Sequence, residues 1–202
     1  MMHQDLWRVR CFLINSMRNQ KVTSENVDQI LFDTFSALGY DGTSMEILAK
    51  ASGLKKASLY HRFPNGKKEM ALHVLSNSEQ FLHENVVKIA AEHDVAPEIR
   101  MKKVIDVIDQ IYDGGANNCL LRTLSVGTDS DFFKGAVNKC FDQLSEGFEN
   151  IALDLGNEPE TAKSKAKDVN LLIQGSLVMA GATSDKSYFK NTLAKIPAFI
   201  SA

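Results

Sequence analysis

TSMEILAKASGLKKASLYHRFPNGKK fills residues 43–68, and the interpretation of the whole chain starts from this stretch. Two short helices are predicted within it, over residues 43–51 and 55–62. Gly53 separates them, because a glycine tolerates the left-handed backbone of a sharp turn. Pro64 ends the second helix, since the residue before a proline avoids helical geometry. Two short helices joined by a tight turn are the pattern of a helix-turn-helix.

Side-chain chemistry in this stretch fits that geometry. The Thr43 hydroxyl is expected to cap the first helix, with Glu46 completing a capping box. Ala49 is small enough for the second helix to cross the first closely. The residues expected to hold the second helix on the core are apolar: Leu48, Leu54, Leu59 and Phe63. The residues left exposed carry charge or hydrogen-bonding groups: Lys55, Lys56, Ser58, Tyr60, His61 and Arg62.

Charge is unevenly distributed along the chain. The whole protein has a formal net charge of -2, but residues 1–75 hold 10 Lys/Arg against 7 Asp/Glu, and residues 55–68 contain no acid. A basic end on an acidic body favours a partner, such as nucleic acid, that touches one end only. Spacing and charge alone leave a second interpretation open, an ordinary helical hairpin with a solvated basic face.

Apolar spacing is helical almost everywhere after Ser24, and no segment alternates as a strand does. The predicted fold is therefore all-α with about nine helices. We expect an N-terminal extension (1–22), a three-helix helix-turn-helix domain (23–70) and a helical C-terminal domain (71–202). The expected helices span residues 24–38, 43–51, 55–62, 67–92, 97–113, 119–126, 130–155, 160–182 and 187–200.

Bulk features exclude several classes of protein. Cys11, Cys119 and Cys140 are odd in number and widely spaced, which argues against a disulfide framework or a zinc site and favours a reducing compartment. No apolar run is long enough for a membrane span or a signal-peptide core, so a cytoplasmic protein is expected. The chain has no nucleophile elbow, phosphate loop or dinucleotide fingerprint, and no metal, cofactor or catalytic residue is predicted.

Detailed sequence matches then favour the DNA-binding interpretation. The segment from Val27 to Leu75, about a quarter of the chain, resembles the DNA-binding domain of the TetR family of transcriptional regulators. The matching elements are Phe35-x-x-x-Gly39-Tyr40, Gly42-Thr43-Ser44, Ile47-x-Ala49-x-x-x-Gly53 and, most specifically, Ser58-Leu59-Tyr60-His61-x-Phe63-Pro64-Asn65-Gly66-Lys67. The remainder resembles the family only in helix count and layout, and in a Cys119-Leu120-Leu121 element.

The resemblance implies roles for individual residues. Positions that meet base edges in the major groove are occupied by Lys56, Ala57, Ser58 and His61. Positions that meet phosphates are occupied by Thr43, Ser44, Tyr60 and Lys67. Lys55 is expected to contact either a base or a phosphate. Lys68 stands where relatives often carry an acid, and we expect it to strengthen nonspecific DNA affinity. Outside this segment, Arg8, Arg10, Arg18 and Lys21 form either a basic arm or an extension without a role.

The same resemblance implies a repressor that binds a palindromic operator as a homodimer and is released from it by a small-molecule effector. The residues expected at the dimer interface are Leu171, Leu172, Gly175, Val178, Leu193 and Ile196. The residues expected to line an effector pocket are Phe81, Tyr112, Cys119, Phe132, Phe141, Phe148 and Met179. Both sets have a plainer interpretation as intramolecular core.

Three alternatives remain at this stage. A regulator that senses redox state through Cys119 is the first. A helical adaptor that binds only protein is the second, and it predicts no salt-dependent affinity for DNA. The third is an activator instead of a repressor.

Overall fold

The computed structural model describes residues 24–201, and the regular elements of this range are all helices, without a strand. The expected N-terminal extension and its basic residues lie outside the described range. The all-α prediction is confirmed. The predicted number of helices also agrees with the described part of the chain when the contiguous helical segments of residues 67–90 are counted as one and the short 3-10 turn at residues 113–115 is left out.

Helix boundaries fall within a few residues of those expected from the sequence. The elements are α2 (Ser24–Gly42), α3 (Met45–Ser52), α4 (Lys56–Arg62), α5 (Lys67–Leu82), η1 (His83–Val87), α6 (Lys88–Ala90), α7 (Pro97–Ile111), η2 (Asp113–Gly115), α8 (Leu120–Leu124), α9 (Ser130–Asp154), α10 (Pro159–Thr183) and α11 (Ser187–Ser201).

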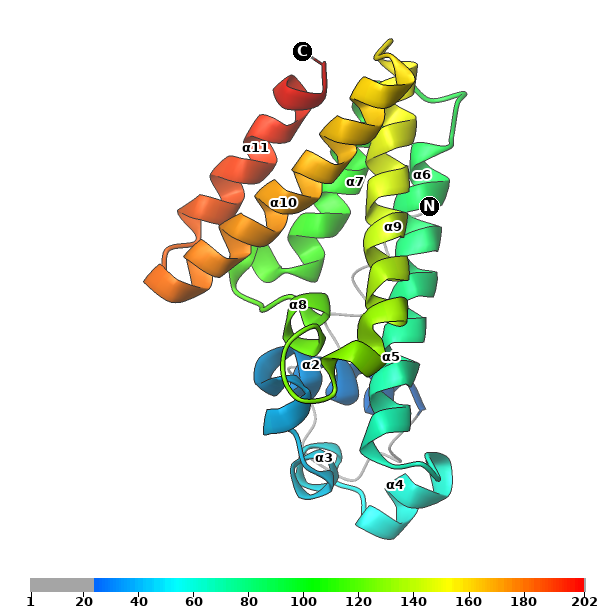
Figure 1. The fold of residues 1–202 in the computed structure, drawn as a ribbon, viewed down its shortest axis with the longest axis vertical. Coiled ribbons are helices and arrows are strands. Elements are labelled where there is room, and N and C mark those ends of the chain that lie inside the picture. Colours follow the sequence, from blue (N-terminus) through cyan, green and yellow to red (C-terminus); the bar gives the residue numbers. More distant parts are fainter. Residues whose placement is uncertain (1–23, 202) are drawn as a thin grey trace.

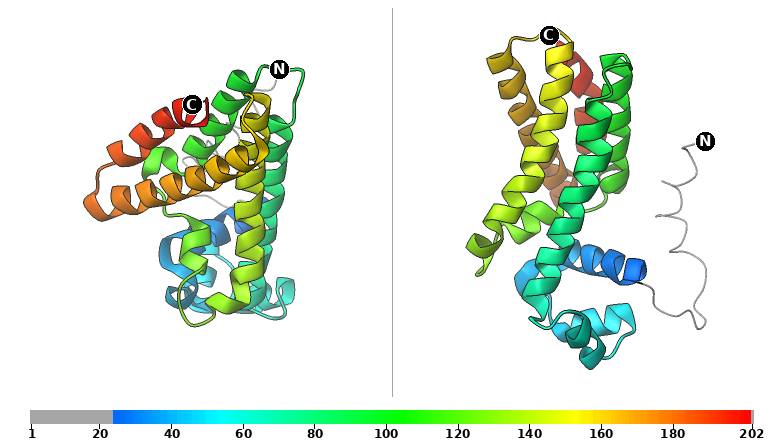
Figure 2. Two further views of the ribbon diagram at one scale, coloured as in Figure 1. Left: turned by 45° about the horizontal axis from the view of Figure 1, so that its top comes forward. Right: turned by 90° about the vertical axis from the view of Figure 1, so that its right-hand side faces the viewer.

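The helices form two connected parts. α2, α3 and α4 gather at one end of the molecule, and α5 runs from that end into the helical body (Figure 1). α9 packs along α5, and α10 lies between α9 and α11 (Figure 2). α8 packs on α2 and so joins the body to the small end of the molecule. A continuous helix therefore links the two parts, as the sequence predicted.

An apolar stripe fixes α2 on the core. Val27, Leu31 and Phe35 recur at intervals of four residues and have no exposed surface, as expected of one face of an amphipathic helix. Helical geometry breaks at Gly39, whose φ of 65° and ψ of -174° turn the last residues of the element. The predicted stop at Gly39 therefore corresponds to a kink, after which three more residues complete the element.

The long fourth helix differs from its prediction in one respect. Instead of running unbroken over residues 67–92, it contains a π-helical turn at His83–Val87. Val86 in this turn packs against Gly147 of α9, where a Cβ atom would come within 2.5 Å of the valine side chain. The bulge coincides with a close contact between the two helices, which is tertiary information that apolar spacing does not contain.

A buried arginine connects α7 to the end of α6 and to the end of α9. Arg100 of α7 is 1% exposed, and its guanidinium donates to the carbonyl oxygens of Val95 and Ala90. It also contacts the Asp154 carboxylate at 2.6 Å, and His93 contacts the same carboxylate at 2.8 Å. The Arg100 hydrogen bond is the main cause that holds the pKa of Asp154 below its ordinary value.

None of the helices within residues 24–201 has the length and apolar character that crossing a bilayer requires. Nor do His, Cys, Asp and Glu side chains of that range gather in threes at a potential metal site.

Candidate DNA interface

The first helix of the helix-turn-helix is capped one residue later than expected. Ser44 is the cap of α3, and its hydroxyl accepts a hydrogen bond from the Ile47 N–H at 3.2 Å. Thr43 is 1% exposed, and its hydroxyl donates to the Gly39 carbonyl oxygen at 2.6 Å. The predicted Thr43 cap and its expected phosphate contact are therefore wrong, because this hydroxyl closes the end of α2 instead. Ser44 stays exposed at the helix start.

Glu46 also has a different partner from the expected one. Its carboxylate lies 3.3 Å from the Lys56 ammonium and so links α3 to the first residue of α4. Both side chains are largely exposed, so the ion pair contributes little to stability. The ion pair matters locally, because it engages the ammonium group of Lys56, which was expected to contact base edges.

The turn between the two helices has the predicted geometry. Gly53 adopts a left-handed conformation with φ 67° and ψ 10°, and its N–H donates to the Lys50 carbonyl oxygen. The buried Ser52 hydroxyl donates to the Leu48 carbonyl oxygen at 2.7 Å. Beyond the turn, Leu59 has no exposed surface and Phe63 is 5% exposed. These contacts hold α4 by one face and leave its other face outward.

That outward face carries the residues predicted to contact DNA. All of them are exposed: Lys55, Lys56, Ala57, Ser58, Tyr60, His61 and Arg62. Tyr60 is 47% exposed, and its ring rests on Gly66, where a Cβ atom would come within 3.2 Å of the ring edge. The close approach positions the phenol beside the start of α5. An exposed helix of two turns bearing hydroxyl, imidazole and cationic groups is suited to a major groove.

The two lysines at the start of α5 face the protein. The Lys67 ammonium donates to the Tyr40 carbonyl oxygen at 2.8 Å and lies 3.9 Å from the centre of the Tyr40 ring. The Lys68 ammonium lies 3.2 Å from the Asp129 carboxylate and 3.9 Å from the centre of the Phe132 ring. Both ammonium groups therefore make contacts within the protein, although Lys67 was expected to meet a phosphate and Lys68 to strengthen nonspecific DNA affinity. The backbone N–H groups in the first turn of α5 are still able to bind an anion, because Gly66 has no side chain that could cap them.

Sequence reasoning missed a set of contacts between the end of α2 and the α8–α9 loop. The Thr128 N–H and hydroxyl donate to the two Asp41 carboxylate oxygens at 2.9 and 2.7 Å. The Thr128 hydrogen bonds are also the main cause that lowers the pKa of Asp41. Gly127 allows this approach, because a Cβ atom there would lie 2.3 Å from the Asp41 carboxylate. Thr123 of α8 donates to the Phe35 carbonyl oxygen at 3.1 Å.

We call these contacts, together with those of Lys67 and Lys68, the junction. It joins α2, the start of α5 and the start of α9. Burial is the main cause that raises the pKa of Tyr40 at its centre, followed by the nearby Asp129 and Asp41 charges. The residues come from segments far apart in sequence, so no local motif predicts them.

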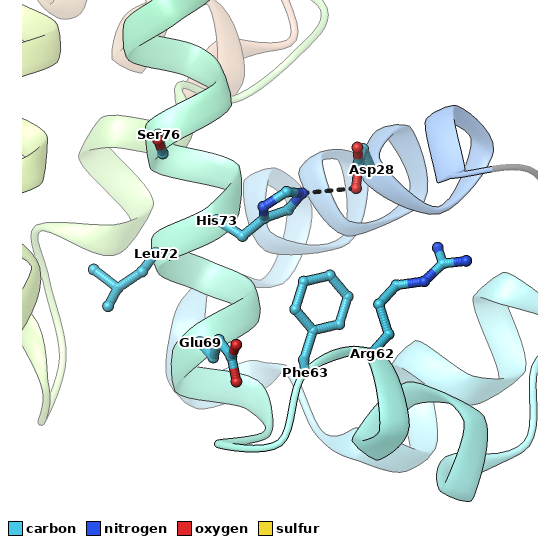
Figure 3. A pocket seen from close by; sticks show the side chains of 7 residues that line it. All are labelled: Asp28, Arg62, Phe63, Glu69, Leu72, His73 and Ser76. Atoms are coloured by element: carbon cyan, nitrogen blue, oxygen red, sulfur yellow. Dashed lines mark hydrogen bonds and ion pairs between the residues drawn. The ribbon is translucent and has the colours of Figure 1, made fainter.

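A pocket of about 550 Å³ lies between α2, the end of α4 and α5 (Figure 3). It is lined by Asp28, Arg62, Phe63, Glu69, Leu72, His73 and Ser76. His73 contacts Asp28 at 2.9 Å across its floor and so braces α5 against α2. None of the predicted effector residues lines this pocket.

The residues predicted to form an effector pocket are dispersed. Tyr112 and Cys119 are together, with the Tyr112 hydroxyl donating to the Cys119 sulfur at 3.3 Å. Phe148 has no exposed surface, and Phe141 is partly buried. The others are substantially exposed: Phe81 (38%), Phe132 (49%) and Met179 (42%). Phe132 belongs to the junction through Lys68, so it is not beside Tyr112 in a common pocket.

Cys119 itself is 1% exposed. A buried thiol is protected from oxidants, and reactive cysteines are usually accessible. Its burial argues against the redox-sensing alternative.

The predicted dimer residues divide into two groups. Four of them present an exposed surface on α10: Leu171 (70%), Leu172 (45%), Val178 (47%) and Gly175. Leu193 and Ile196 of α11 are 5% and 0% exposed within the single chain. Those two were wrongly assigned to the interface, because their side chains already pack inside the protomer.

Comparisons with known proteins were made for the whole chain. Residues 32–74 match the family model described as "Bacterial regulatory proteins, tetR family". The HTH-type transcriptional regulator YxaF of Bacillus subtilis (strain 168) is 23% identical over 170 residues, which cover 82% of this chain and 88% of YxaF. The HTH-type transcriptional regulator LmrA of the same organism is 23% identical over 149 residues, covering 72% and 79%.

A solved structure supports the similarity over nearly the full length. The crystal structure of a TetR transcriptional regulator from Legionella pneumophila has a TM-score of 0.76 and 21% identity, and it covers 90% of this chain and 98% of its own. The segment matched by the family model begins in α2 and ends in α5. It therefore contains the whole helix-turn-helix.

Proposed function

We propose that this chain is a transcriptional regulator of the TetR family, which represses transcription by binding a palindromic operator as a homodimer and is released from that operator by a small molecule. Operator binding places the protein in the cytoplasm. The observation that carries the proposal is the outward face of α4. It projects from a helix-turn-helix whose turn, cap and buried contacts leave that face exposed.

Roles on that face follow from chemistry and position. Ala57, Ser58 and His61 are assigned to base edges, with Lys56 available once its exposed pair with Glu46 opens. Tyr60 and Ser44 are assigned to phosphates, together with the first-turn N–H groups of α5, which attract anions. Lys55 is placed at the beginning of the face and suits a base or a phosphate.

Dimer formation supplies the necessary specificity. Each good base contact discriminates by only about 1–3 kcal/mol, so one helix of two turns reads too little sequence for a genome. Two copies related by a twofold axis read two half-sites about one DNA turn apart. We assign the dimer interface to the exposed apolar face of α10, where Leu171, Leu172 and Val178 surround Gly175.

The junction is proposed as the route between effector and DNA. A ligand that repositions α8 or α9 displaces Thr128 and Asp129, and these residues hold α2 and α5. The effector then changes the separation of the recognition helices, and DNA and effector weaken each other's binding by the same factor.

The test is a direct measurement of DNA affinity for the purified full chain. Fragments selected from random duplexes supply the operator, and fluorescence anisotropy measures binding at several salt concentrations. We expect a palindromic consensus and a steep fall of affinity with added salt, because phosphate contacts release counterions. Absence of binding to every fragment at low ionic strength would overturn the proposal and leave a protein-binding adaptor. Higher transcription of a reporter in the presence of the protein would identify an activator.

A further inference from the structure

Two amide side chains on the buried side of α10 have polar atoms without hydrogen-bond partners. Within residues 24–201, four buried side-chain polar atoms lack a partner, and three of them belong to Asn170 and Gln174. For Gln174 both the amide nitrogen and the amide oxygen are affected. The two residues are four positions apart, so they lie on the same face of the helix, one turn from each other.

Asn170 is held in place by one half of its amide. Its nitrogen donates to the Ser145 hydroxyl at 2.8 Å and to the Phe141 carbonyl oxygen at 3.3 Å, both on α9. Its oxygen is buried without a donor. The α9 contacts orient that oxygen and make Asn170 a fixed acceptor in the interior of the body.

Further polar groups meet Gln174 from α7 and the start of α8. The Gln174 amide lies beside the Tyr112 hydroxyl, where its effect is to lower the pKa of the phenol, and that hydroxyl donates to the Cys119 sulfur at 3.3 Å. Burial is the main cause that raises the pKa of Tyr112, and it raises the pKa of the nearby Cys140 to about 12. The phenol and this thiol are therefore uncharged near neutral pH.

Burying amide groups without partners is unfavourable, and native proteins rarely keep such groups without a compensating role. Here the unpartnered atoms are concentrated on adjacent turns of one helix and next to a buried phenol. We propose that Asn170, Gln174 and Tyr112 form the polar part of the effector site, and that the effector is an uncharged, planar molecule bearing both a hydrogen-bond donor and an acceptor. This inference rests on the proposed function, because it identifies the ligand class of a ligand-responsive regulator.

The ligand class follows from the groups present. The Gln174 amide offers one donor and one acceptor side by side, which matches a primary amide, a lactam or a phenol with an adjacent carbonyl. The neighbours that act on the Tyr112 hydroxyl are Cys119, Gln174 and Cys140, all uncharged groups. A charged ligand would lose its hydration without gaining a counterion, so the site discriminates against ions. The Phe189 ring, edge-on to Tyr112 with 5.7 Å between ring centres, adds an aromatic wall.

The experiment uses two probes of nearly identical shape. 4-Hydroxybenzamide is neutral at pH 7, whereas 4-hydroxybenzoate carries a negative charge. Saturation-transfer NMR on the full chain without DNA reports binding at millimolar probe concentration, so the result does not depend on operator binding. We expect transfer to the amide and none to the carboxylate.

Two variants assign the binding to this site. Gln174→Met keeps the volume but removes both amide atoms, and Tyr112→Phe removes only the hydroxyl. Tyr112→Phe should weaken 4-hydroxybenzamide about tenfold, the value of one lost hydrogen bond, and Gln174→Met should weaken it at least as much, while Gln174→Met leaves Tm unchanged or raises it. Gln80→Met is the matched control, because Gln80 is exposed on α5, and it should leave probe binding unchanged.

Several outcomes would overturn the inference. These are equal binding of the two probes, no binding of either, or binding of the amide that neither variant weakens. A fall in Tm for Gln174→Met beyond that of Gln80→Met would show that the amide stabilises the fold, with buried water as its partner. Loss of DNA binding alone would reject the proposed function and leave these readouts intact.

Discussion

Tyr60 and His61 are adjacent on the outward face of α4, yet their chemistry assigns them different tasks. The Tyr60 ring is positioned by Gly66 at the start of α5, where we propose that its hydroxyl meets a phosphate. The His61 imidazole offers a donor or an acceptor to a base edge. Phosphate contacts fix position without reading sequence, whereas base contacts select it.

Tyr60→Phe and His61→Ala should therefore differ in kind. Tyr60→Phe keeps the ring contact and removes one hydrogen bond to a charged group, so affinity should fall about tenfold on every duplex. His61→Ala should change the preferred base at one position of each half-site by about 1–3 kcal/mol. Fluorescence anisotropy on a panel of single-base operator variants distinguishes the two patterns. A sequence-dependent loss with Tyr60→Phe would refute its phosphate role.

Asp154 is the second residue whose role is separable. Its carboxylate is the charged partner of the buried Arg100, so Asp154→Asn leaves a guanidinium without its counter-charge. We expect the free energy of unfolding to fall by about 1–3 kcal/mol at pH 7. The pKa of Asp154 is lowered in the folded state. The ion pair therefore stabilises the fold fully at pH values above the ordinary pKa of an aspartate. This stabilisation is lost as the pH falls through the lowered pKa of the folded state. Urea unfolding at a series of pH values should show that the free energies of unfolding of the unmodified protein and of Asp154→Asn become equal in acid.

At the scale of elements, the junction determines how α2 and α5 meet the body. Asp41, Thr128 and Asp129 are exposed or partly exposed polar residues in a turn and at helix ends, which in sequence are typical of a solvated loop. Their importance arises only because α8 packs on α2 and brings residues 87 positions apart into contact.

Asp41→Ala should open this contact without disturbing the recognition helix. The Thr128 N–H loses its acceptor, so its amide hydrogen should exchange with solvent several-fold faster in NMR exchange experiments. Asp142→Ala removes an exposed carboxylate of α9 away from the junction and serves as the control. Unchanged exchange at Thr128 in Asp41→Ala would show that the junction does not hold the loop, and the proposed route for the effector signal would fail.

At the scale of the whole molecule, α10 has two faces with different partners. Val169, Ile173 and Leu177 are buried inside the chain, while Leu171, Leu172 and Val178 are exposed on the other side. Large apolar side chains gathered on one exposed helix face mark an interaction surface, in contrast to isolated ones.

Leu172→Glu should convert the dimer to a monomer, because burying a carboxylate in an apolar contact is costly. Operator affinity should then fall by more than about a hundredfold, since half of the base contacts are lost. Sedimentation velocity measures the assembly state. Ile99→Glu is the matched control, because Ile99 is 54% exposed on α7, outside the α10 face. A Leu172→Glu protein that remains dimeric would place the interface elsewhere.

Local chemistry in the sequence was sufficient for the all-helical class, the helix boundaries, the Gly53 turn and the outward face of α4. Each depends on neighbours within a few positions, and backbone preferences and periodicity act over that range. The partners of Thr43, Lys67 and Lys68, the burial of Leu193 and Ile196, and the amide pair on α10 were decided only by folding. Those features depend on which helices become neighbours, and a polar or apolar side chain looks the same in sequence whether it meets solvent, its own chain or a ligand.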